Sequence, residues 1–193
     1  MKRPPPFAPA SVAAPLLSSL RDKERPAYGQ AATVDGRGRP QVRTVHFRHV
    51  PEKATLGFAA NILSPKWREL RRKRVLSGCW YDHPRSVQFR WEGAVELIEP
   101  RAAGPSGRRT LDRMWLLLRS PVRTAYWADF APRGKVDAGR RCPNFGVVLC
   151  RPRMWDVFRM NHKDYIRSTR TIYRLKKGKW AGRRVSVLHG KDL

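Results

Sequence analysis

Short runs of β-branched and aromatic residues, separated by turn signals, recur along the chain and limit most strongly what it can fold into. The runs cover residues 27–34, 41–48, 55–60, 75–81, 86–98, 144–150, 170–175 and 180–188. The dipeptides Asp35-Gly36 and Lys177-Gly178 lie between neighbouring runs and favour antiparallel hairpins. Many short strands combined with few helices predict a mainly β protein, an antiparallel barrel with flanking helices.

Proline and alanine dominate the start of the chain. Residues 1–25 are therefore interpreted as an N-terminal arm, with a short helix expected over 11–20. Residues 26–193 are interpreted as one domain, because a segment of this length can bury a substantial core and shows no internal repeat.

Helices are expected at two places within the domain. Ser64-Pro65 is typical of a helix start, because serine is a preferred N-cap and proline suits the first turn. Residues 110–127 show a helical periodicity that Pro121 interrupts. The remaining segments are expected to form loops over 104–107 and 131–143, and a short helix or turn over 153–160.

The charge of the domain is high for its size. The chain holds 41 Lys and Arg against 15 Asp and Glu, a formal net charge of +26, and residues 41–193 alone hold 34 and 12. Such a surface attracts polyanions, so nucleic acid is a partner to consider. The sequence shows no zinc finger, RNP strand motif, GXXG loop or helix-turn-helix, which argues against a specific nucleic-acid module.

Membrane, metal and disulfide interpretations find little support in the sequence. No apolar run approaches the roughly 18 residues of a membrane span. Cys79, Cys142 and Cys150 form no CxxC pair, and the five histidines show no metal-ligand spacing. We therefore expect no metal site, and a reduced, cytoplasmic protein.

Two segments carry groups that suit a phosphate. The run over 41–48 presents Arg43 and, at its end, Arg48, and the next run leads into Ser64 with Lys66 in the first helical turn. A hydroxyl, a cation and free backbone N–H groups at a helix N-terminus form an anion site. On local features alone, a solvated Arg-rich strand and an ordinary capped helix are the simpler explanation.

The order of motifs over a longer stretch adds a resemblance to a known family. Arg43, the pair Ser64-x-Lys66 and the segment Gln88-x-Arg90-x-x-Gly93 follow one another in the chain. In this order they resemble the pyridoxamine 5′-phosphate oxidase-like FMN-binding split-barrel superfamily, and more its broad oxidase-like branch than the authentic oxidase. The resemblance implies a six-stranded antiparallel split β-barrel with flanking helices, FMN as cofactor, and a homodimer with its sites between the subunits.

The same resemblance implies the residues of the cofactor site. They are Arg43, Arg48, Ala59, Ala60, Ser64, Lys66, Gln88, Arg170 and Trp180. Arg43, Ser64 and Lys66 would hold the FMN phosphate. Gln88 would reach the flavin or its ribityl chain, and Arg170 would approach the cofactor from the partner subunit.

The sequence departs from the family pattern at several positions. Ala59 and Ala60 stand where the family has a Tyr/Phe-Thr pair whose backbone lies along the flavin ring. Pro65 stands where the oxidase often has a second phosphate-binding arginine. Ile166 and Ser168 replace the R-x-H substrate signature of the oxidase, which argues against pyridoxamine phosphate as the substrate.

The expected function is an FMN-dependent oxidoreductase acting on an unidentified small, anionic molecule. His46, Arg119 and Arg123 are its candidate substrate contacts, and no catalytic acid or base is assigned because hydride transfer belongs to the flavin. Within the superfamily, a deazaflavin coenzyme or heme could take the place of FMN. A cofactor-free basic split barrel that binds nucleic acid is the alternative from another class, favoured by Ala60 and Pro65 and disfavoured by the retained phosphate-binding residues.

Overall fold

The computed structural model of the chain describes residues 6–20, 27–128 and 139–189. The helices are α1 (Ala10–Leu20), α2 (Pro65–Arg72), α3 (Pro105–Leu116) and α4 (Ser120–Tyr126), with short 3-10 turns η1 (Pro51–Lys53) and η2 (Tyr165–Arg167). The strands are β1 (Tyr28–Val34), β2 (Pro40–His46), β3 (Arg48–Val50), β4 (Thr55–Asn61), β5 (Val75–Asp82), β6 (Val87–Ile98), β7 (Phe145–Arg159), β8 (Thr169–Lys176) and β9 (Lys179–Val185).

The described strands form one antiparallel sheet in the order β2-β1-β5-β6-β7-β4-β3, and β8 continues from β7 to β9. Its two ends, β2 and β3, are consecutive in the chain and separated only by Phe47. The barrel is split because the sheet does not close between these two ends. Phe47 connects them along the chain. Its ring is buried in the core, and its backbone N–H donates to the carbonyl of Ala27 at 3.0 Å.

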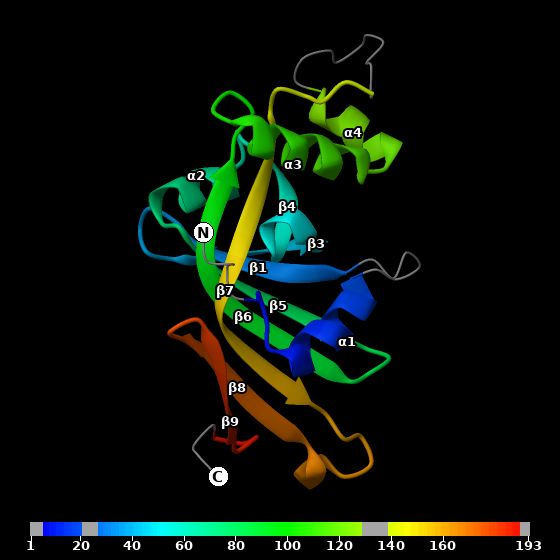
Figure 1. The fold of residues 1–193 in the computed structure, drawn as a ribbon, viewed down its shortest axis with the longest axis vertical. Coiled ribbons are helices and arrows are strands. Elements are labelled where there is room, and N and C mark those ends of the chain that lie inside the picture. Colours follow the sequence, from blue (N-terminus) through cyan, green and yellow to red (C-terminus); the bar gives the residue numbers. More distant parts are fainter. Residues whose placement is uncertain (1–5, 21–26, 129–138, 190–193) are drawn as a thin grey trace.

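The expected fold class is confirmed, but the expected number of strands is too low. The described part of the chain contains nine strands, and the sheet is not closed. One additional strand arises because the run over 41–48 breaks at Phe47 into β2 and β3. The hairpin of β8 and β9 pairs with the end of β7 and extends below the barrel (Figure 1).

Strand β7 runs unbroken from Phe145 to Arg159, so the short helix or turn expected over 153–160 is wrong. Trp155 and Val157 are buried on the barrel side of this strand. Pro152 is accommodated opposite Gly93, where the register with β6 shifts at a bulge. A Cβ at Gly93 would lie 2.2 Å from the carbonyl oxygen of Arg151, so only glycine permits this close approach of the strands.

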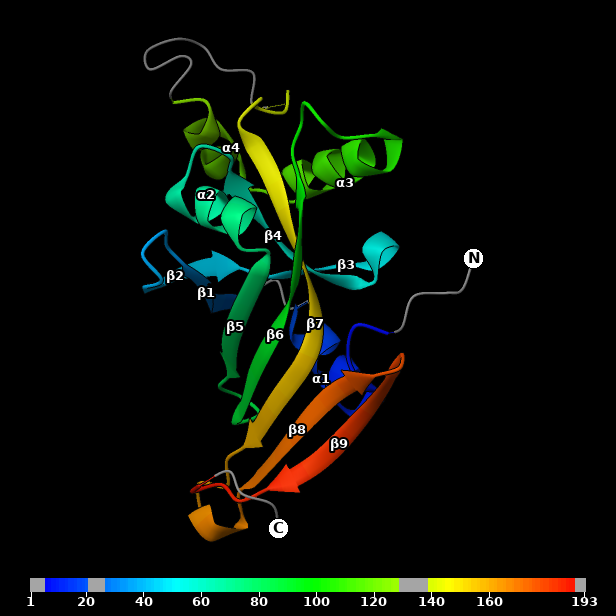
Figure 2. The same ribbon diagram turned by 90° about the vertical axis from the view of Figure 1, so that its left-hand side faces the viewer.

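Helices α2, α3 and α4 lie at the upper part of the sheet, whereas α1 lies lower, beside the barrel, as Figures 1 and 2 show. Helix α2 begins at Pro65 as expected, but α3 already begins at Pro105, within the loop expected over 104–107. The helical stretch expected over 110–127 is interrupted near Pro121 as predicted: α3 ends at Leu116 and α4 begins at Ser120, with Pro121 in its first turn, where its missing N–H has no cost. The part of the expected loop 131–143 that precedes residue 139 lies outside the described residues.

Two hydrophobic clusters lie on either side of the sheet. The larger fills the barrel with aromatic side chains in edge-to-face and tilted contacts, among them Phe47, Trp91 and Trp155. The smaller lies beneath α3, around Trp115 and Phe145. None of the described helices is long and apolar enough to cross a membrane.

The N-terminal segment is part of this packing. Helix α1 buries Val12 and Leu16 against the barrel core. The chain just before the helix is held by two indole N–H groups, because Trp155 donates to the carbonyl of Phe7 at 3.0 Å and Trp180 to that of Pro6 at 2.8 Å. The boundary expected near residue 25 lies outside the described residues and stays a prediction.

Candidate functional site

Arg43 projects from β2 toward the buried face of α2. Its guanidinium forms an ion pair with Glu69 at 2.8 Å and also donates to Thr33 Oγ1 and to the carbonyl of Gln41. Thr33 in turn donates to the Glu69 carboxylate. Thr33 and Glu69 are buried, at 3% and 9% exposure, so this network fixes the position of the Arg43 guanidinium.

Lys66 lies in the first turn of α2, close to this network. Burial and the neighbouring charge of Arg43 lower the pKa of Lys66, and the carboxylate of Glu69 offsets only part of that effect. Among the described residues, Lys66 has no hydrogen-bonded ion pair of its own, because the Glu69 carboxylate is bonded to Arg43. Two half-buried cations thus lie near one carboxylate, which pairs directly with Arg43, and this leaves an excess positive charge suited to an anion.

Ser64 occupies the N-cap position of α2, as the sequence predicts. Its hydroxyl does not cap the helix but donates to the carbonyl of Asn61 at 2.6 Å. A phosphate at this helix start would meet Lys66, Arg43 and the end of β4, and this donor set fits a phosphate monoester. The Ser64 hydroxyl would have to turn from Asn61 to join it.

A second basic cluster forms where β2 passes into β3. The Arg48 guanidinium donates to Nδ1 of His46 at 3.2 Å and to the carbonyl of Leu117 at 3.0 Å. Burial lowers the pKa of His46 to about 4, and the charges of Arg48 and Arg119 act in the same direction. His46 is therefore a neutral imidazole at neutral pH, with its proton on Nε2 and its ring 5.0 Å from that of Tyr28.

This low pKa makes folding stability sensitive to acid. Because the unfolded chain binds a proton at His46 near pH 6.5 and the folded chain only near pH 4, stability falls as the pH drops between these values. Arg48, Arg119 and Tyr28 face this ring. We expect the difference in unfolding temperature between His46→Gln and the wild type to shift in favour of the variant from pH 7 to pH 5. Thermal unfolding followed by circular dichroism measures this difference.

The matched control for this comparison is His83→Gln, because His83 is exposed in the β5–β6 turn. Its unfolding temperature should keep a constant difference from wild type over the same pH range. If His46→Gln behaves in the same way as His83→Gln, the low pKa of His46 is wrong.

Three predicted residues lie apart from these two clusters, on the outer face of the sheet or beside the N-terminal segment. Gln88 alternates with the buried Phe89 on β6 and therefore points away from the barrel interior. Across the sheet, Gln88 pairs with Phe158, and Phe158 with Arg170, so these three residues form one row. Trp180 contacts the N-terminal segment through its bond to Pro6.

Arg170 is engaged within its own chain. Its guanidinium donates to both carboxylate oxygens of Asp156, at 3.0 and 2.7 Å, and Arg90 binds the same carboxylate. Burial would raise the pKa of Asp156, but the bonds from Arg170 and Arg90 outweigh burial and hold this pKa below its usual range. Sequence reasoning missed Asp156, whose place in a strand interior gives no local signal.

The remaining predicted residues lie at the end of β4 and in α4. The Ala60 side chain is buried in the barrel core, whereas Ala59 packs against the cluster beneath α3. Arg123, in α4, has a buried Nε with no hydrogen-bond partner among the described residues. One chain thus brings Arg43, Ser64 and Lys66 into one group and His46 with Arg48 and Arg119 into another.

Glu69 is the functional residue that sequence reasoning missed in the first group. It is the one acidic residue of α2, whose other polar side chains are basic or at the helix start. An acid at this position lies on the same helix face as Lys66, three residues earlier. Its isolation among cations was the signal that could have identified it.

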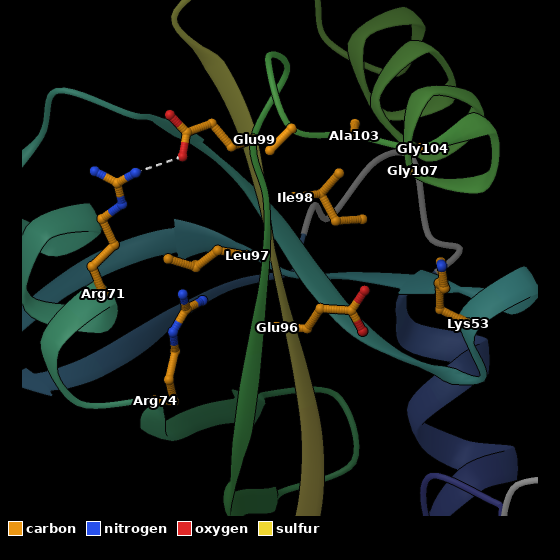
Figure 3. Close-up of a pocket in the computed structure, with 11 residues that line it drawn as sticks. Lys53, Arg71, Arg74, Glu96, Leu97, Ile98, Glu99, Ala103, Gly104 and Gly107 are labelled. Atoms are coloured by element: carbon orange, nitrogen blue, oxygen red, sulfur yellow. Dashed lines mark hydrogen bonds and ion pairs between the residues drawn. The ribbon is translucent and has the colours of Figure 1, made fainter.

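A cavity of about 330 Å³ lies elsewhere, beside β6 and the start of α3 (Figure 3). Its lining includes Lys53, Arg71, Arg74, Glu96 and Glu99 but none of the predicted site residues. Arg71 is already paired with Glu99 at 2.8 Å, and Figure 3 shows the lining side chains on both sides of β6. This cavity therefore does not belong to the candidate site. The described residues also contain no cluster of three metal-ligating side chains.

Comparison with known proteins identifies sequences and structures that are similar to this chain. Residues 11–99 match the family model described as the FMN-binding domain of pyridoxamine 5′-phosphate oxidase. Pyridoxine/pyridoxamine 5′-phosphate oxidase 2 of Arabidopsis thaliana is 30% identical over 90 residues, which are 46% of this chain and 46% of that protein. The match therefore spans about half the length of this curated relative.

Two solved structures share the fold over nearly the whole chain. A pyridoxamine 5′-phosphate oxidase-related, FMN-binding protein of Nostoc punctiforme is 23% identical with a TM-score of 0.79, covering 93% of this chain and 97% of that one. PhzG of Burkholderia lata, solved with tetrahydrophenazine-1-carboxylic acid, is 19% identical with a TM-score of 0.72 and covers 94% of each chain. Residues 11–99 are thus similar to the FMN-binding domain of pyridoxamine 5′-phosphate oxidase, and the chain as a whole shares the split-barrel fold of these two solved structures.

Proposed function

We propose that the protein binds FMN and acts as a flavin-dependent oxidoreductase on a small anionic molecule. The observation that carries the proposal is the half-buried pair of cations, Arg43 and Lys66, which lie near the single carboxylate of Glu69. The FMN phosphate carries about two negative charges near neutral pH and would neutralise this excess. The family match supports the choice of a flavin over other phosphorylated ligands.

The residues around the phosphate position supply the rest of the cofactor site. The ends of β4 and the first turn of α2 meet here, so the backbone of Ala59 and Ala60 would lie beside the ring system. The flavin, when bound, supplies hydride transfer. The protein contributes a fixed phosphate clamp, because the network of Arg43, Glu69 and Thr33 holds the guanidinium in place.

The second basic cluster would take the substrate. Arg48 and Arg119 contribute positive charge there, whereas His46 is neutral and offers an N–H donor. An anionic group on the substrate would compensate these cations, with Arg123 as a further candidate contact. An anionic substrate is also consistent with the relatives, since the ligand in the PhzG structure is a carboxylic acid and the name of the Arabidopsis enzyme specifies a phosphate ester.

A second copy of the chain would complete the site. Within one chain, Gln88 and Arg170 lie on the outer face of the sheet, in a different group from Lys66. The same face leaves large apolar side chains uncovered, with Tyr28 at 60% and Val42 at 65% exposure. A homodimer that packs this face would cover them and bring Arg170 of one chain toward the phosphate group of the other.

The test is the spectrum and mass of the purified protein. We expect a yellow protein with a flavin spectrum, release of FMN on denaturation, and a mass in solution of two chains by light scattering. Titration of the cofactor-free protein should show tighter binding of FMN than of riboflavin, because riboflavin lacks the phosphate. A colourless protein that takes up neither flavin would overturn the proposal. Preferential uptake of a deazaflavin coenzyme or of heme would show that this ligand, and not FMN, is the cofactor.

A further inference from the structure

The hairpin of β8 and β9 concentrates positive charge that, apart from Arg170, the proposed flavin site does not use. Residues 169–185 contain seven Lys and Arg, namely Arg170, Arg174, Lys176, Lys177, Lys179, Arg183 and Arg184, and no Asp or Glu. Arg170 pairs with the carboxylate of Asp156 on the neighbouring strand β7. The hairpin lies below the barrel, and its β8–β9 turn points back up beside the N-terminal segment (Figures 1 and 2). Lys177 and Gly178 form this turn.

The strand register separates the two faces of the hairpin. Tyr173 and Trp180 share one face, which contacts the N-terminal segment through Ser11 at 3.1 Å and Pro6 at 2.8 Å. Arg174, Lys176 and Lys179 alternate with these residues and therefore lie on the opposite, exposed face. Together with the exposed Lys177 of the turn, Arg174, Lys176 and Lys179 are called the tip cluster below.

The tip cluster places like charges next to one another. Lys176 lies directly opposite Lys179 in the ladder, an arrangement that is destabilising in an isolated hairpin. Among the described residues, none of the four tip-cluster side chains forms an ion pair with a carboxylate. A polyanion laid along this face would relieve the repulsion that the protein alone leaves uncompensated.

We propose that the tip cluster binds the phosphate backbone of double-stranded DNA without reading its sequence. A two-stranded ribbon fits the width of the major groove. The exposed face of the tip carries no aromatic side chain on which an unpaired base could stack, because Tyr173 and Trp180 lie on the other face. It also presents no large apolar side chain for insertion into a lipid surface.

The experiment measures binding of the full-length protein to a short DNA duplex of mixed sequence by fluorescence anisotropy over a salt series. The variant Arg174→Gln, Lys176→Gln, Lys177→Gln, Lys179→Gln should bind about tenfold more weakly or worse at low salt, with a salt slope shallower by up to about 3.6, since each phosphate contact contributes about 0.9. All four side chains are exposed, so near-ultraviolet circular dichroism should stay unchanged.

The control removes the same charge from the helical end of the molecule, as Arg72→Gln, Lys73→Gln, Arg101→Gln, Arg109→Gln. It should lose much less affinity and keep most of the salt slope. Equal losses of affinity in both variants would show that DNA binding depends on net charge alone, which would overturn the proposal. The tip cluster would then serve only to keep the exposed edge strand β9 from pairing with another strand. Tighter binding to single-stranded DNA, or binding to phosphatidylserine vesicles without binding to the duplex, would also overturn the proposal. None of these outcomes depends on the flavin.

Discussion

Arg43→Ala is expected to lower the free energy of unfolding by about 3 kcal/mol, because it leaves the buried carboxylate of Glu69 without its ion-pair partner. Thr33 would then be the remaining hydrogen-bond partner of that carboxylate in the network. The same change removes one of the two cations proposed for the FMN phosphate, so FMN binding should weaken as well. Urea unfolding followed by circular dichroism measures the first effect, and flavin fluorescence titration the second.

Two further variants separate the buried charge from the loss of a surface arginine. Arg39→Ala breaks a pair with Asp35 on the same hairpin, but Arg39 is 63% exposed, so the change should cost much less stability than Arg43→Ala. Adding Glu69→Gln to Arg43→Ala should recover part of the lost stability, since no unpaired charge then stays buried. A double variant no more stable than Arg43→Ala would contradict this account of the network.

Lys66→Met is expected to weaken FMN binding by about 10- to 150-fold. This factor corresponds to the loss of one charge-assisted hydrogen bond, which contributes about 1.5–3 kcal/mol. Riboflavin binding should hardly change, because riboflavin has no phosphate to meet Lys66. Folding stability should be kept, since burial already disfavours the Lys66 charge and methionine keeps most of the apolar side-chain volume. Titration of the cofactor-free variant with FMN and with riboflavin measures both affinities.

The matched control is Lys73→Met at the other end of the same helix, where the side chain is exposed at the C-cap. It should bind FMN as the wild type does. Parallel losses of FMN and riboflavin affinity in Lys66→Met would place the phosphate elsewhere, and unchanged FMN affinity would remove Lys66 from the site.

Most of the strands could be predicted from the sequence, as could the start of α2, where the residues proposed to bind phosphate lie. Alternation of apolar and polar side chains identifies strands over short stretches, and Ser64-Pro65 marks the start of α2 through local backbone preferences. The second half of β7 was not predicted, because burial on both faces hides the alternation and Pro152 suggests an end. Only pairing with β6 and β8 on either side makes that segment a strand.

The sequence by itself determined which residues are candidates: the charge of +26, the strand pattern, and Arg43 and Lys66 in the order of a phosphate-binding family. Only the tertiary structure decided how those residues are used. It pairs Arg43 with Glu69, 26 positions away, and ties Arg170 to Asp156 on the outer face of the sheet. The physical reason is that side-chain alternation is a local property of the chain, whereas charge pairing depends on which distant strands the closing sheet brings together.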